Sequence, residues 1–168
     1  MSRLSKIADS RIAALPRRNW ESEPLSATRV QEVTALVRTR VGCQMLFPIQ
    51  AASLIEAFEC GGLFCAAQVG AGKTLTSGLL PLVLGAVRPM LVVPASLVEK
   101  TQLEFEQLRL HWQIPRNIRI VSYTALGLEK NATLLHAYSP DVVIFDEAHK
   151  LKARISGAAA HRGCGSSP

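Results

Sequence analysis

Four short apolar runs divide the chain, and the segments between them have the apolar spacing of helices. The runs cover residues 63–67, 90–94, 118–123 and 142–145. The first two are apolar without alternation, which is typical of strands buried on both faces. Strands that alternate with helices form parallel sheets with right-handed crossovers. The pattern therefore predicts an α/β fold in which helices cover both faces of a parallel sheet.

Helical spacing and end signals predict the connecting helices. They cover residues 28–41, 48–58, 73–84 and 97–108, and a weaker helix falls within 124–137. The first has an apolar stripe formed by Val30, Val33, Leu36 and Val37.

Caps and breakers fix several of these helix ends. Pro48 suits the first turn of the second helix, and Gly61 suits its end. Ser96 is predicted to cap the fourth helix, with Glu99 three residues later as in a capping box. Pro81 is expected to kink or shorten the third helix.

Composition is that of a globular protein, with 48% hydrophobic and 19% charged residues among 168. We predict a flexible lead-in at 1–27, one domain at 28–153, and a disordered or non-native tail at 154–168. Neither a secretory signal nor an apolar run of about 18 residues is present. A cytoplasmic protein with no membrane segment is the expectation.

The cysteines form no C-x-x-C pair and have no histidine at zinc-finger spacing. They are predicted to be free, mostly buried thiols, and they are Cys43, Cys60, Cys65 and Cys164.

A glycine loop joins the first apolar run to the third helix. Residues 70–74 read Gly-Ala-Gly-Lys-Thr, and the two glycines allow a tight turn that aims backbone N–H groups at phosphate oxygens. Lys73 would reach the β- and γ-phosphates, and the Thr74 hydroxyl would ligate magnesium. The general pattern has glycine where this chain has Ala67. A chance glycine turn is the competing interpretation, and the strand–loop–helix context favours the phosphate loop.

The last apolar run ends in two acids, Asp146 and Glu147. In an open α/β sheet such strand ends converge at the ligand crevice. Asp146 can hold magnesium, and Glu147 can orient or deprotonate an attacking water. The alternative is that both acids only cap the helix that follows. The upstream lysine-bearing loop favours the metal-binding role.

These two segments resemble a known family. Gly70-Ala71-Gly72-Lys73-Thr74 and Asp146-Glu147-Ala148-His149 resemble motifs I and II of superfamily-2 helicases and translocases. The following Lys150-Leu151-Lys152 is most similar to the Swi/Snf-type (Snf2-like) branch, and alanine at position 67 is usual in that family's motif I. The resemblance covers residues 44–152. It implies a RecA-like P-loop NTPase domain that couples Mg²⁺-ATP hydrolysis to nucleic-acid binding or remodelling.

The resemblance also implies residue roles. Gln50, in Phe47-Pro48-Ile49-Gln50, would read adenine, and the phosphates would lie on Gly70, Ala71, Gly72, Lys73 and Thr74. Asp146 and Thr74 would bind Mg²⁺, and Lys73 and Glu147 would be catalytic. Residues 91–97 and 121–124 resemble two weaker motifs that face nucleic acid.

Family features that are missing from this sequence shape the functional hypotheses. The second RecA-like domain, which supplies arginine fingers, is not in it, nor is the Ser/Thr-Gly/Ala-Thr motif. We expect the ATP-binding half of a helicase or translocase, either as a truncated product or as a fragment that works with a second helicase domain on another chain. A net charge of +6 agrees with a nucleic-acid partner, and double-stranded DNA is favoured by the Swi/Snf likeness.

Two other classes remain. One is a non-catalytic ATP- and DNA-binding remnant or regulatory module. The other is a P-loop enzyme for a small substrate, such as a kinase, which ranks last because residues 76–110 predict an apolar helix and a strand end rather than a lid.

Isolated aromatic and basic residues have two interpretations each. The aromatics could stack on bases, but packing is favoured for Trp20, Trp112 and Tyr123. His111 and His136 are predicted to be ordinary surface residues. Contact with phosphates and a solvated face are equally compatible with Arg17, Arg18, Arg38 and Arg40.

Overall fold

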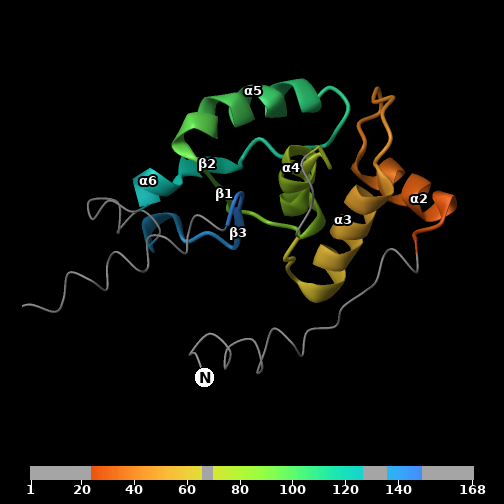
Figure 1. The fold of residues 1–168 in the computed structure, drawn as a ribbon, viewed down its shortest axis with the longest axis horizontal. Coiled ribbons are helices and arrows are strands. Elements are labelled where there is room, and N and C mark those ends of the chain that lie inside the picture. The colour runs from red at the N-terminus through yellow and green to blue at the C-terminus, as the bar shows by residue number, and fades with distance from the viewer. Residues whose placement is uncertain (1–23, 66–69, 127–135, 149–168) are drawn as a thin grey trace, which may run out of the picture.

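The computed structural model describes residues 24–65, 70–126 and 136–148 (Figure 1). Its elements in chain order are the helices α2 (Ala27–Val37), α3 (Pro48–Cys60) and α4 (Lys73–Val83), strand β1 (Pro89–Val93), the 3-10 helix η2 (Ala95–Leu97), helix α5 (Val98–Leu108), strand β2 (Arg119–Ser122), helix α6 (Tyr123–Leu126) and strand β3 (Val142–Phe145). Several predictions fall wholly or partly outside the described residues, namely those for the lead-in, Trp20, Ala67, the middle of the weak helix, His149, Lys150 to Lys152, Cys164 and the tail.

The sheet is built around β1. Strands β2 and β3 pair with β1 in parallel on either side of it, and all five residues of β1 are buried. The register pairs Val93 with Ser122 and Val92 with Phe145, so the three strands end at one edge. This mixed architecture with an all-parallel sheet agrees with the predicted α/β class.

Neighbouring residues of β1 point to opposite faces and bury two apolar clusters. Leu91 and Val93 join the larger cluster, which includes residues of α2, α3, α4 and α5. Met90 and Val92 join the smaller one with Tyr123 of α6. Figure 1 shows α5 running above β1 and β2, while α6 lies at the end of β2. Among the described residues, the sheet face that carries Met90 and Val92 is therefore covered only by short helical segments.

Helix α2 is shorter than predicted, and the face that it buries differs from the predicted face by one residue. Its N-cap is Ser26, whose hydroxyl oxygen accepts the Arg29 N–H at 3.2 Å. The side chain of Leu36 is 75% exposed, so its predicted place in the buried stripe is wrong. With 3.6 residues per turn, the buried face consists instead of Val30, Val33, Thr34 and Val37.

Helices α3 and α4 begin where the sequence predicts. Helix α3 starts at Pro48, and its C-cap Gly61 has a left-handed φ of 67°. Helix α4 continues through Pro81 to Val83, so the proline does not break it. Gly78 lets α4 approach α5 closely, because a Cβ at this position would lie 3.0 Å from both Phe105 and Ile114.

Two local predictions are wrong. Residues 63–65 of the run at 63–67 form no strand, and the Phe64 side chain is 88% exposed. An apolar run becomes a strand only where a neighbour completes its hydrogen bonds and packing. Ser96 does not cap α5, because it lies within η2 and the N-cap position is Leu97, which has no side-chain cap bond.

The cysteines in the described ranges form no disulfide and are exposed, so the prediction of mostly buried thiols is wrong for Cys43, Cys60 and Cys65. Each thiol has a different polar neighbour. The Cys43 sulfur lies 3.8 Å from His111 Nδ1, and the Cys60 thiol donates to Glu56 at 3.5 Å. Among the described residues, no helix is long and apolar enough to cross a membrane.

Asp141 joins the starts of β1 and β3. Its carboxylate accepts the backbone N–H groups of Val87 at 2.7 Å and Arg88 at 2.9 Å. Desolvation alone would raise the pKa of Asp141, but these backbone hydrogen bonds outweigh it and hold the pKa below its ordinary value of 3.8. The ionised carboxylate is therefore the form that stabilises this end of the sheet.

This lowered pKa predicts a pH-dependent contribution to stability. The contribution is present above pH 3.8, the ordinary pKa, and is lost as pH falls through the lower folded-state value. Asp141→Asn should therefore lower the urea midpoint at pH 7, and the difference from wild type should shrink in acid. Urea unfolding at several pH values measures this. An equal deficit at every pH would contradict it.

Candidate nucleotide and magnesium site

The described part of the glycine loop turns at its two glycines. Gly70 and Gly72 adopt left-handed φ values of 88° and 72°, a region that favours glycine. Gly72 is the N-cap of α4, and its carbonyl accepts the Thr76 N–H at 3.2 Å. Helix α4 therefore begins at Lys73, and the N–H groups of its first turn face the loop.

Gln50 is brought directly against this loop. Its side chain is 4% exposed, and Nε2 donates to the Ala71 carbonyl at 3.2 Å. The amide oxygen accepts the Phe47 N–H at 2.8 Å, which ties Gln50 to the start of its own helix. The glutamine predicted to read adenine is thus hydrogen-bonded to the loop predicted to bind the phosphates.

Lys73 and Thr74 follow as the first two residues of α4, and both are partly exposed. Within the described ranges, neither side chain makes a hydrogen bond or ion pair to another residue. Both groups can therefore contact a ligand without first breaking a bond within the described part of the protein.

The acids stand where β3 ends. The Asp146 N–H donates to the Val92 carbonyl at 2.9 Å, which extends the pairing of β3 with β1 by one residue. Glu147 has a φ of 57°, an uncommon left-handed value for a residue other than glycine. The chain therefore turns sharply at the two acids.

Tyr123 holds this turn from the neighbouring segment. Its hydroxyl donates to the Asp146 carbonyl, and its ring is stacked on Phe145 with centroids 6.4 Å apart. Burial raises the pKa of Tyr123, and the negative charges of Asp146 and Glu147 raise it further. The phenol therefore remains protonated at neutral pH and can donate its hydrogen.

The parallel register gathers three predicted segments at the C-terminal edge of the sheet. Residues 94–97 follow β1, Tyr123 and Thr124 follow β2, and Asp146 and Glu147 follow β3. Open parallel sheets bind ligands at this edge. The segments predicted to face nucleic acid and the predicted magnesium ligand therefore share one edge.

The structure thus contains two hydrogen-bonded groups, one joining Gln50 to the glycine loop and one joining Tyr123 to the acids. No group of three or more histidines, cysteines or acids with metal-binding geometry is present in the described ranges. Residues 66–69, which precede Gly70 in the glycine loop, and His149, the last residue of the acidic motif, are not among the described residues.

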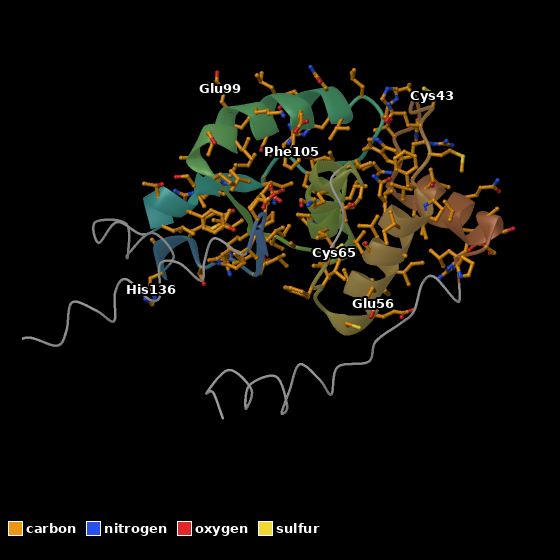
Figure 2. All side chains as sticks on the ribbon, in the orientation of Figure 1. Cys43, Glu56, Cys65, Glu99, Phe105 and His136 are labelled. Carbon is orange, nitrogen blue, oxygen red and sulfur yellow. The ribbon has the colours of Figure 1, made fainter. Side chains whose placement is uncertain are left out.

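A separate groove lies away from both groups, between α5 and β2. Its volume is about 470 Å³, and its lining includes Phe105, Ile118 and Ile120 with Glu106 and Arg109. Figure 2 marks Phe105 on the side of α5 that faces the core and Glu99 on the outer side. Because none of the predicted site residues lines this groove, it does not form part of the candidate nucleotide site.

Trp112 and Tyr123 serve packing, as predicted. Trp112 is buried, and its Nε1 donates to Gln44 at 3.0 Å. Tyr123 is 8% exposed and packs on Met90 and Val92. The sequence analysis missed the bond from Tyr123 to Asp146. A tyrosine directly after a strand parallel to the acidic strand is the signal that could have revealed it.

Comparison with known proteins yields no relative, since no family model, curated protein or solved structure matches the chain. The functional argument therefore depends on the sequence motifs and on the geometry of the two groups.

Gly72 is required at its position for two reasons, and Gly61 offers a matched control. Both are left-handed, but a Cβ on Gly72 would lie 2.1 Å from Gln50 Nε2, whereas one on Gly61 would meet nothing within 4 Å. Gly61→Ala should cost about 1–2 kcal/mol of unfolding free energy. Gly72→Ala should cost more, because the Gln50 amide must also leave Ala71. Equal losses in urea unfolding would show that Gln50 does not constrain the loop.

Proposed function

We propose that this chain is the ATP-binding half of a superfamily-2 helicase or translocase and that its fold is a RecA-like P-loop domain. The observation that supports this most strongly is the hydrogen bond from Gln50 to Ala71. It joins the residue assigned to the adenine base with the loop assigned to the phosphates, although 21 residues separate them. A chance glycine turn gives no reason for a buried glutamine to bind that loop.

In this proposal each group of the loop has one task. The N–H groups of residues 70–74 and the Lys73 ammonium neutralise the phosphate oxygens. Gln50 positions the base, which requires its amide to exchange at least one of its present partners. The left-handed glycines allow the backbone to approach the phosphates closely.

The residues present suit a magnesium ion. Mg²⁺ prefers oxygen ligands and usually binds through one or two protein groups plus phosphates and water. Thr74 and Asp146 supply a hydroxyl and a carboxylate, and neither makes a side-chain hydrogen bond within the described ranges. When bound, the ion would neutralise charge on the β- and γ-phosphates.

Glu147 is the proposed base. It directly follows the acid proposed to bind metal, and its left-handed φ of 57° lies at the turn that ends β3. A carboxylate at the nucleotide edge can orient the attacking water and accept its proton. Backbone strain of this kind is more frequent at functional sites than elsewhere.

The proposed polymer partner is double-stranded DNA, which would cross the segments after β1 and β2 at the edge that holds the acids. A second helicase domain is the proposed source of the arginine finger. Such an arginine is worth about 10³–10⁵ in rate, so turnover by this chain alone should be slow.

Replacing the loop lysine tests the nucleotide site. Lys73→Ala should weaken binding of a fluorescent ATP analogue by about 10- to 100-fold, because a charge-assisted phosphate contact is lost. Lys100→Ala, on the exposed surface of α5, is the matched control and should bind like wild type. If Lys73→Ala retains wild-type affinity, the site assignment is wrong.

Replacing the proposed base separates binding from chemistry. Glu147→Gln should reduce DNA-stimulated ATP turnover by about 10²–10⁴-fold and leave Mg²⁺-ATP affinity near wild type. Glu99→Gln, on α5, is the control for loss of one acid. Binding without turnover in the wild type, with or without double-stranded DNA, would favour the non-catalytic module instead.

A further inference from the structure

The peptide plane between Asp146 and Glu147 sets the backbone conformation that joins the two acids. Its orientation sets ψ of Asp146 and φ of Glu147 together, because a peptide unit is rigid. With φ of Glu147 at 57°, the plane has an orientation that residues other than glycine adopt rarely. Some contact must therefore hold it there.

The contacts on this plane come from two sides. The Asp146 N–H, on the preceding peptide, is bound by the Val92 carbonyl at 2.9 Å, and this fixes where the turn begins. The Asp146 carbonyl, which belongs to the plane itself, accepts the Tyr123 hydroxyl. A rotation of the plane would break the second bond and leave the first intact.

The hydroxyl can act as a fixed point because the ring is immobilised. Tyr123 packs on Met90 and Val92 of the central strand and is stacked on Phe145, the residue before Asp146, with an interplanar angle of 22°. The ring of Tyr123, which follows β2, thus packs on side chains of β1 and β3.

We propose that Tyr123 is the positioning residue of the magnesium-binding turn. By holding the Asp146 carbonyl, it maintains Glu147 in its left-handed conformation and restrains the backbone that would present the Asp146 carboxylate to the metal. This inference rests on the proposed function, in which Asp146 is a magnesium ligand. It assigns no contact between Tyr123 and the nucleotide.

The chain contains a matched control for this role. Tyr138 belongs to the same apolar cluster, and its hydroxyl donates to the Pro89 carbonyl at 3.2 Å, at the opposite end of β1. Tyr123→Phe and Tyr138→Phe therefore remove the same group from the same cluster. Only the first variant touches the acidic turn.

The test is the affinity of the folded chain for a fluorescent, non-hydrolysable ATP analogue, measured in Mg²⁺ and in EDTA. Tyr123→Phe should reduce the ratio of the two affinities by about three- to tenfold, which corresponds to one hydrogen bond. Its affinity in EDTA should stay at the wild-type value, because Gln50 and the loop are unchanged. Tyr138→Phe should change neither affinity, although urea should unfold both variants slightly earlier than wild type.

A double-mutant cycle with Asp146→Asn identifies the route of the effect. If Tyr123 acts through the Asp146 carboxylate, Tyr123→Phe should lower the Mg²⁺ dependence no further in the Asp146→Asn background. An additive loss would overturn the inference. So would a wild-type ratio in Tyr123→Phe, or an equal fall of the ratio in Tyr138→Phe. A wild-type chain that binds no nucleotide in either buffer would overturn the proposed function itself, and the inference with it.

Discussion

The burial of β1 is the constraint on which the other contacts depend. All five of its residues are inaccessible to solvent, and both neighbouring strands take their register from it. Its odd and even positions reach different apolar clusters, so one strand joins the helical layer to the small cluster around Tyr123. Because parallel strands end together, this register also decides which loops meet at the C-terminal edge. A slip of one residue would exchange the two faces of the strand.

The group that contains Gln50 and the group that contains Tyr123 have the same kind of hydrogen bond. In each, a buried side-chain donor binds a backbone carbonyl of a loop, Gln50 at Ala71 and Tyr123 at Asp146. A donor on a carbonyl restrains the peptide plane to which that carbonyl belongs. Each loop also contains left-handed residues, which require such support when they are not glycine. The groups that we propose to bind ligand are therefore held through the backbone.

Local sequence signals predicted the elements whose ends are fixed by local chemistry. Pro48 and Gly61 bound α3 as expected, and the acidic strand at 142–145 has the predicted limits. Predictions failed where a distant partner decides the outcome. Leu36 is exposed, and Thr34 is buried on that helix instead. The Thr34 hydroxyl also accepts the N–H of Leu46, which lies beyond the end of the helix. Ser96 lies in a 3-10 turn after β1, so it is not available as a cap. The bond from Tyr123 to Asp146 spans 23 residues and follows only from the sheet order, which the sequence pattern did not specify.

The late position of β3 in the chain has a consequence for the order of folding. The carboxylate of Asp141 and the backbone of Arg88, which join β3 to β1, are 53 residues apart, and closing so long a loop is slow compared with docking neighbouring helices. We therefore expect α3 and α4 to associate, with the glycine loop between them, before the acids reach the sheet. A ligand that needs both the loop and the acids would bind only the completed fold. Its binding free energy would then oppose the release of the last strand.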